Sequence, residues 1–239
     1  MAIREAKPDV VPPDEFLEEL EDLRRAYLKG DVLRPRRRYQ SIDEAAAARR
    51  RFHLGGRGHN HKFEGERYLN CTDRDVRRRQ LRKIIDEEGE TTVGGPKLPH
   101  PMLMRRESHA FGVTDAEIDR LEKEDTTPDE LVWMGWRTAM HREAHWAVGI
   151  GSSLVGEGEK RIPEIRQKLL DDIEALRAEY TAMGVEDLDG ALGNLIEHAG
   201  IDEEHSEFGA EVTRRFVNTP ELQDELRQAF ILTMHLRGF

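Results

Sequence analysis

Apolar residues in this chain recur three and four positions apart, in segments bounded by helix-capping residues, proline and glycine. Pro101 and Pro163 suit first helical turns, and Thr114 followed by Glu117 forms a capping-box pattern. No segment alternates apolar and polar residues as a strand does, and no internal repeat is present. The sequence therefore predicts an all-α fold. The expected helices cover about residues 16–29, 45–52, 74–88, 100–113, 116–124, 128–159, 163–183, 188–216 and 220–236.

Length and charge limit the number of domains and the kind of partner. A chain of 239 residues is long enough for one substantial domain, expected to span residues 1–239. Its net charge of -11 argues against nucleic acid as the main partner, because phosphate-binding proteins usually carry a basic excess. No apolar run reaches the roughly 18 residues needed to span a bilayer. We expect a cytoplasmic protein with no membrane partner, and we interpret its single cysteine, Cys71, as a small buried hydrophobe.

His198, Asp202 and His205 form the pattern HxxxDxxH. At 3.6 residues per turn their side chains fall within about 60° of one another on one stripe of a helix. Buried polar side chains need partners, and a metal ion would satisfy all three at once; a metal-free hydrogen-bonded cluster is the alternative. The stripe should face inward, because small or apolar residues extend it. These residues are Ala191, Leu195, Gly209, Val212 and Phe216.

A carboxylate on another segment supports a metal site. On a helix covering residues 128–159, Glu159 shares the apolar face and Glu157 lies nearly opposite, unless Gly156 and Gly158 break the helix first. Carboxylates and imidazoles in a helical core favour iron or manganese over a structural zinc site. The apolar face is defined by Met140, Ala144, Val148, Gly151 and Val155.

Three segments resemble the heme-oxygenase-like diiron oxidases in order and in local residues. The stretch IIDEEGETTVGGPKLPHPMLMRRESHAFGVTDAEI (residues 84–118) is similar to that family's DEEG helix end, followed by a histidine and an LGV-type turn. The other two segments are EKRIP, with Glu159 four residues before Pro163, and HAGIDEEH. The family includes a para-aminobenzoate synthase and shares its fold with pyrroloquinoline-quinone synthase and the TenA thiaminases. The resemblance covers about residue 68 to the end of the chain, and residues 1–60 carry little of it.

The resemblance implies a heme-oxygenase-like bundle of about seven or more helices, with a divergent N-terminal portion (1–60). It implies a homodimer that holds two Fe(II) ions, or a manganese/iron pair, and uses O2 as co-substrate. The substrate would be a small organic molecule, amino-acid-like or fatty-acid-like, altered by N-oxygenation, C–C cleavage or desaturation. The implied metal ligands, which are also the implied catalytic residues, are Glu87, His100, Glu159, His198, Asp202 and His205.

Glu88 is the alternative to Glu87 as the first carboxylate. On a helical wheel Glu88 lies with Leu81, Ile84 and Ile85 better than Glu87 does, whereas the DEEG resemblance assigns Glu87. The loop that leads to His100 is also longer than the family pattern. We favour Glu87, because the last turn of a helix often tightens and rotates side chains away from the ideal wheel.

Two other classes of function stay open. One is a metal-free protein of the same fold that binds a small molecule or makes a cofactor, of the quinone-synthase or thiaminase type. A thiaminase would need a catalytic cysteine, and Cys71 lies outside the ligand region. The other class is a structural or partner-binding bundle.

The remaining histidines are not expected to bind a catalytic metal. His141 and His145 in HREAH have the spacing of a zinc pair but lack the glutamate of HExxH, so we interpret them as core or supporting residues. His53, His59 and His61 fall in a glycine-rich stretch and are expected to be exposed or to form a fortuitous metal-binding patch.

Overall fold

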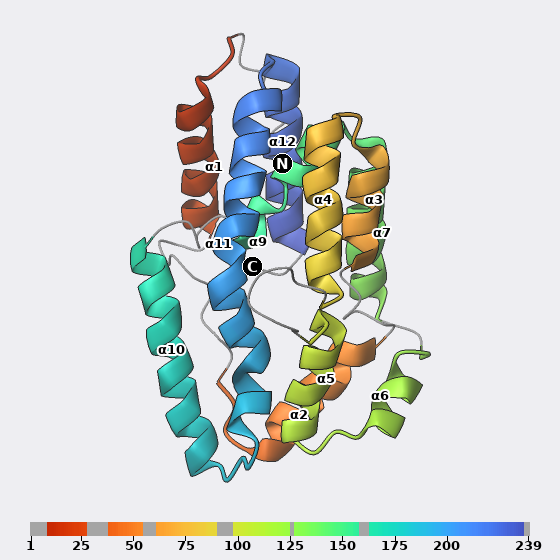
Figure 1. The fold of residues 1–239 in the computed structure, drawn as a ribbon, viewed down its shortest axis with the longest axis vertical. Coiled ribbons are helices and arrows are strands. Elements are labelled where there is room, and N and C mark those ends of the chain that lie inside the picture. The colour runs from red at the N-terminus through yellow and green to blue at the C-terminus, as the bar shows by residue number, and fades with distance from the viewer. Residues whose placement is uncertain are drawn as a thin grey trace.

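A computed structural model describes residues 9–27, 38–54, 61–89, 98–124, 127–157 and 163–236. Within them, the side chains of 61–62, 156–157, 163–166 and 198–205 are left out. The described residues form helices and no strand (Figure 1). The helices are α1 (Pro13–Tyr27), α2 (Ile42–His53), α3 (His61–Asn70), α4 (Arg74–Glu87), α5 (His100–Ala110), α6 (Asp115–Leu121), α7 (Pro128–Glu143), α8 (Trp146–Gly151), α9 (Leu154–Glu157), α10 (Pro163–Ala182), α11 (Leu188–Phe216) and α12 (Pro220–Leu236).

Local capping residues start α4, α6 and α11 close to the predicted positions, whereas α2 starts three residues early and α3 was not predicted. Asp73 caps α4 by accepting hydrogen bonds from the backbone N–H groups of Asp75 and Val76. Thr114 and Glu117 form the predicted capping box at the start of α6. Both α11 and α12 begin and end at the expected residues. These interactions satisfy backbone groups that the first helical turn leaves without partners.

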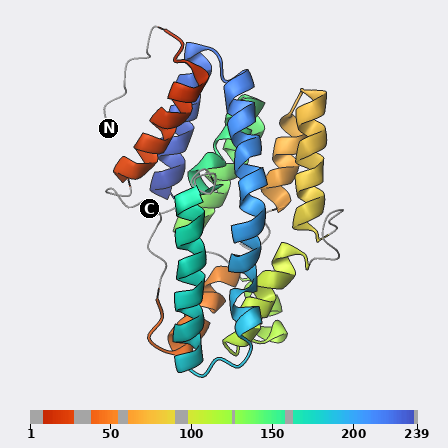
Figure 2. The same ribbon diagram turned by 60° about the vertical axis from the view of Figure 1, so that its left-hand side comes forward.

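Helix α11 runs through the full height of the molecule and contacts α1, α5, α8, α9 and α10 (Figures 1 and 2). The upper half of Figure 1 holds α1, α3, α4, α7 and α12, and the lower half holds α2, α5, α6 and α10. Two separate groups of buried side chains pack against the two halves of α11. The molecule therefore has two hydrophobic cores joined by one long helix.

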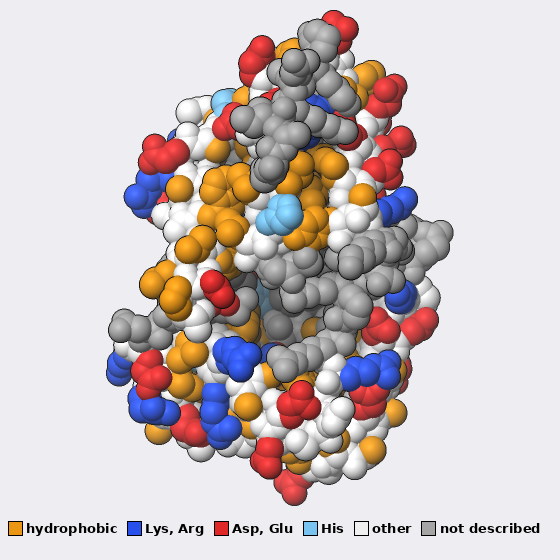
Figure 3. Space-filling view, turned by 180° about the vertical axis from the view of Figure 1, so that it is seen from behind, with side chains coloured by type: hydrophobic (Ala, Val, Ile, Leu, Met, Phe, Trp, Pro, Cys, Tyr) orange, Lys and Arg blue, Asp and Glu red, His pale blue; other side chains and the backbone are white. Residues whose placement is uncertain are grey.

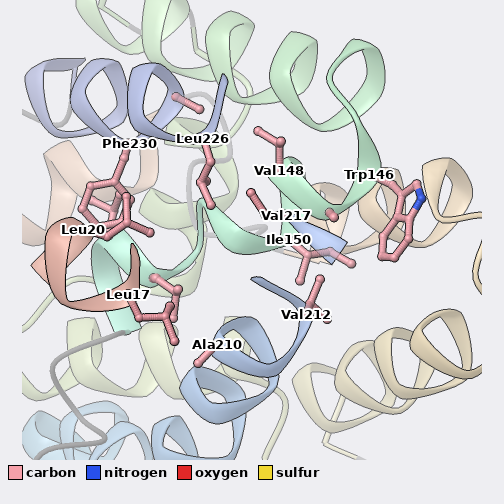
Figure 4. Close-up of a cluster of buried hydrophobic side chains, with 14 of the residues drawn as sticks. Leu17, Leu20, Trp146, Val148, Ile150, Ala210, Val212, Val217, Leu226 and Phe230 are labelled. Atoms are coloured by element: carbon pink, nitrogen blue, oxygen red, sulfur yellow. The ribbon is translucent and has the colours of Figure 1, made fainter. Parts of the chain in front are cut away.

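The upper core lies between α1, α8, α12 and the second half of α11 (Figure 4). Its members include Leu20, Val148, Ile150, Val212 and Phe230, all exposed by 2% or less. The lower core joins α2, α6 and α10 to the first half of α11, and includes Ala45, Ile118, Ile173 and Leu192. From behind, hydrophobic side chains also gather at the surface of the upper half, around a histidine (Figure 3). No helix in the described ranges is long and apolar enough to cross a membrane.

The prediction of one helix over residues 128–159 was wrong. The chain leaves α7 at Ala144, whose backbone is extended (φ −69°, ψ 162°), and α8 starts with the side chain of His145 accepting from the N–H of Ala147. Asn70, from the end of α3, donates to the carbonyl oxygens of His141 (3.0 Å) and Ala144 (2.9 Å). A second break at residues 152–153 separates α8 from α9. The helical wheel that placed Glu159 inward therefore does not apply.

Two glycines let the broken segment approach α11 closely. A Cβ atom at Gly151 would lie 2.8 Å from Oγ1 of Thr213, and one at Gly209 would lie 3.2 Å from Cδ2 of Leu154. Only hydrogen fits at Gly151 without movement of its neighbours. This contact fixes α8 and α9 against the second half of α11.

Candidate metal centre

Glu87 and His100 meet at the point where α4 ends and α5 begins. Glu87 is the last residue of α4, and Gly89 follows with a φ of 83°, a conformation that favours glycine and ends the helix. His100 is the first residue of α5, and its Nδ1–H donates a hydrogen bond to Oε2 of Glu87. The side chains are only 8% and 5% exposed. Two residues of ligand type are thus held together in a buried position.

The side chain of Glu88 lies on the other side of α4, exposed to solvent. The wheel correctly groups Glu88 with Leu81 and Ile85, but these two side chains are 42% and 37% exposed. The buried face of α4 instead carries Gln80, Lys83 and Glu87. The assumption that the apolar side of this helix marks its inward face was wrong.

His198, Asp202 and His205 lie on the continuous helix α11, although their side chains are outside the described residues. The predicted stripe is buried on both sides of them. Ala191 is fully buried, and Val212 is 1% exposed. Gly209 is also buried, and Leu195 and Phe216 are partly buried. The stripe is therefore inward before and after the three predicted ligands.

Contacts between α5 and α11 show which part of α11 lies beside His100. Arg106 of α5 hydrogen bonds to Asp187, which caps α11. Leu103, one turn earlier in α5, lies against Gly193, further along α11. The two helices are therefore antiparallel, and His100 is level with about residue 196 of α11, since the rise per residue is the same in both helices. That level is less than one turn from His198.

Glu159 lies outside the described residues, two positions after the end of α9. Leu154 at the start of α9 packs against Gly209, about one turn beyond His205. The described segment ends with helix α9, so the position of Glu159 relative to α11 stays a prediction.

The described donor atoms suit iron. A carboxylate in contact with an imidazole inside a helical bundle is the nitrogen and oxygen set that iron and manganese accept. Within the described side chains no group of three or more His, Cys, Asp or Glu residues could hold a metal ion. The other predicted ligands have undescribed side chains, so the six-residue ligand set stays a prediction.

An ionic cluster lies one turn before Glu87, between α3, α4 and α7. Glu64 accepts hydrogen bonds from Arg67 (2.6 Å) and Gln80, and the amino group of Lys83 is 3.6 Å from it. Burial alone would raise the pKa of Glu64, but Arg67, Lys83 and Gln80 outweigh it and hold this pKa far below its usual range. The charged Glu64 therefore fixes the polar inward face of α4.

His141 is a core histidine, as predicted. It is 1% exposed, and its Nδ1 accepts a long hydrogen bond (3.5 Å) from Arg67. Burial, together with Arg67 and Arg137, lowers the pKa of His141 well below 6.5. His145 is exposed and caps α8, so the break at Ala144 separates the two histidines of HREAH.

The prediction of an exposed His53 was wrong. His53 ends α2 with 1% exposure, and its Nε2 lies 2.9 Å from Oγ of Ser108. Burial lowers its pKa. The spacing of apolar residues could have revealed this burial, because His53 follows the buried Ala46 by two helical turns. His59 and the side chain of His61 lie outside the described residues.

Cys71 is 1% exposed in the upper core and forms no disulfide, as predicted. Its Sγ donates to the carbonyl oxygen of Asp73, and burial raises the pKa of its thiol. Burial outweighs the nearby positive charge of Arg77, so this environment does not favour a thiolate.

The comparisons with known proteins establish the fold class. The crystal structure of a TenA homolog from Pseudomonas syringae pv. tomato matches with a TM-score of 0.60 and 16% sequence identity. The match covers 99% of this chain and 93% of that chain. No family model and no curated protein matches the sequence. This chain is an all-helical protein with the TenA-like, heme-oxygenase-like fold, and that prediction is confirmed.

Proposed function

We propose that this protein is an O2-dependent non-heme diiron oxidase or oxygenase that acts on a small organic substrate. The observation that carries the proposal is the buried contact between Glu87 and His100, level with the HxxxDxxH segment of α11. The TenA-like fold supports it, because this fold is shared with the diiron oxidases that the sequence resembles. The homodimer, the substrate and the manganese/iron alternative stay predictions.

The six residues Glu87, His100, Glu159, His198, Asp202 and His205 would hold the iron. When bound, the metal pair supplies the reduction of O2 and the oxidation of substrate. The chain's own contribution is positioning. The buried ion pairs of Glu64 fix α4, and the contact of Leu103 with α11 fixes α5, so both helix ends that carry ligands are held in place.

Metal analysis after anaerobic loading tests the proposal. The protein should bind about two Fe(II) per chain, and His198→Ala or Asp202→Ala should lower this by at least one ion. His109→Ala is the matched control, because His109 is 41% exposed and pairs only with Asp115 at the surface. Unchanged iron content in both α11 variants would refute the site.

Exposure of the iron-loaded protein to O2 tests the chemistry. A transient visible absorption band should appear in the wild-type protein and be lost in Glu159→Ala. Glu157→Ala should retain it, because the EKRIP resemblance assigns the ligand to Glu159. Equal loss in both glutamate variants would contradict this assignment.

A thiaminase-type activity is the second candidate, favoured by the match to a TenA homolog. The burial of Cys71 in the upper core argues against it, because a nucleophilic cysteine must be accessible and ionised. We expect no thiamine cleavage by the metal-free protein. Cleavage that disappears in Cys71→Ala would favour this candidate instead.

A further inference from the structure

Helix α4 has an outward face that combines exposed arginines with apolar side chains. Leu81 is 42% exposed and Ile85 is 37% exposed on this face. Four exposed arginines lie around them, and none of the four forms an ion pair with the part of the chain that the structure describes. We define the α4 outer face as Leu81 and Ile85 with Arg74, Arg77, Arg78 and Arg82.

The spacing of these six residues makes one continuous surface. At about 100° per residue they fall within an arc of about 140°, centred close to Leu81 and Ile85. The opposite arc holds the buried Gln80, Lys83 and Glu87. Amphipathic helices normally bury their apolar residues, but α4 buries Gln80, Lys83 and Glu87 together with Val76 and leaves Leu81 and Ile85 exposed among the arginines. These two apolar side chains are available to an external partner.

The charge of the α4 outer face differs from that of the whole chain. The net charge is -11, and several exposed or half-buried arginines elsewhere, such as Arg105, Arg214 and Arg215, are ion-paired. In the described part of the chain the four arginines of α4 have no such partners, and Glu88 is the acidic residue on the same side of the helix. An acidic protein would neutralise them and at the same time cover Leu81 and Ile85.

The composition of this face favours a protein over other polyanions. Arginine is enriched at protein interfaces and lysine is depleted, and every cation of the α4 outer face is arginine. In a symmetric contact between two copies through this face, arginines would oppose arginines, which disfavours a dimer here.

We infer that the α4 outer face docks an acidic one-electron carrier protein of the iron–sulfur type. This inference rests on the proposed function, because an iron pair oxidised by O2 must be reduced again. Each docking would transfer one electron from the reduced carrier, so two dockings convert two ferric ions to two ferrous ions and release two oxidised carriers. Only the width of α4, about 10 Å, separates this face from the side that carries Glu87.

Titration with an acidic plant-type [2Fe–2S] ferredoxin tests the inference. Binding is measured by calorimetry on metal-free protein, so the result does not depend on iron loading or on activity. The double variant Arg78→Glu/Arg82→Glu should weaken binding by about tenfold or more, and added salt should weaken wild-type binding. Arg51→Glu is the matched control, because Arg51 is an exposed arginine of α2 without an ion pair to the described residues. It should change affinity by less than about twofold.

Several results would overturn the inference. Absence of ferredoxin binding, or equal loss in the α4 and α2 variants, would do so while leaving the proposed function to its own iron analysis. Sedimentation of wild-type protein, but not the double variant, with phosphatidylglycerol vesicles would assign the face to a membrane. A dimer that Leu81→Asp dissociates would assign it to a second copy of the chain.

Discussion

Glu87 and Glu88 are adjacent in the sequence but lie in opposite environments. Glu87 is buried against His100, whereas Glu88 is exposed on the outer side of α4. Glu87→Gln should therefore abolish turnover and reduce iron loading, because an amide is a poorer ligand than a carboxylate. Glu88→Gln should keep both properties. Metal analysis and O2 consumption of the two variants, compared side by side, give the result, and a larger loss for Glu88→Gln would move the ligand by one residue.

His141 makes stability depend on pH. Its pKa is lower in the folded protein than the 6.5 expected when unfolded, so only the unfolded chain takes up this proton just below pH 6.5. The contribution of neutral His141 is therefore present above pH 6.5 and is lost as pH falls. Each such proton gives a slope of about 1.4 kcal/mol per pH unit.

His141→Gln should reduce the pH dependence of the unfolding free energy by about the slope that one proton contributes. Urea unfolding at several pH values between 7 and 5 measures this change. Met140→Leu is the control, because it disturbs the same part of α7 without removing a titrating group. A slope that stays unchanged in His141→Gln would mean that His141 is protonated in the folded protein.

Glycines in two helices should respond oppositely to the same substitution. Gly151→Ala places a methyl group 2.8 Å from Oγ1 of Thr213 and 3.0 Å from Leu226, so we expect a loss of about 1–3 kcal/mol. At Gly135, inside α7, a Cβ atom would meet nothing within 4 Å. Gly135→Ala should therefore stabilise the protein by about 0.5–1 kcal/mol. Urea unfolding measures both, and destabilisation by Gly135→Ala would show a contact that the structure does not contain.

Several helix starts were predictable from the sequence, and helix faces were only partly so. Capping residues act within one turn, so the starts of α4, α6 and α11 could be found from neighbouring residues alone. The break at Ala144 could not be found, because it depends on Asn70, 74 positions away in the sequence. The inward face of α4 depends likewise on an ionic cluster that includes Glu64, from another helix.

The parts of the candidate site that depend on neighbouring residues in the sequence were predictable. The burial of Glu87 with His100 follows the DEEG resemblance, whereas the apolar periodicity of α4 pointed to the wrong side. The inward stripe around His198 follows from small and apolar residues on α11 itself. The wheel for Glu159 failed, because periodicity says nothing once the helix that carries it is interrupted.

At the scale of the whole molecule, Glu87, His100 and the middle of α11 lie between the two hydrophobic cores. Glu87 ends a helix of the upper half, and His100 starts a helix of the lower half. Glu159 falls between α9 and α10 in the sequence, and His198 to His205 occupy the middle of α11. A metal bound there would hold both halves.

Metal binding should therefore raise the melting temperature of the whole protein. Mn(II), which is stable in air, at about one hundred times its dissociation constant would add about 2.7 kcal/mol, or roughly 5–10 °C for a chain of this size. Differential scanning calorimetry should show this rise in the wild-type protein and in His109→Ala but not in His205→Ala. The same rise in His205→Ala would place the metal elsewhere.

The two cores also bear on the order of maturation. The described members of both cores are hydrophobic side chains whose packing needs no metal, so both cores can form during synthesis before any metal arrives. In small zinc domains metal uptake and folding are one event, but here insertion would follow folding. Cells short of iron would then accumulate a folded, empty precursor that can be activated later without new protein synthesis.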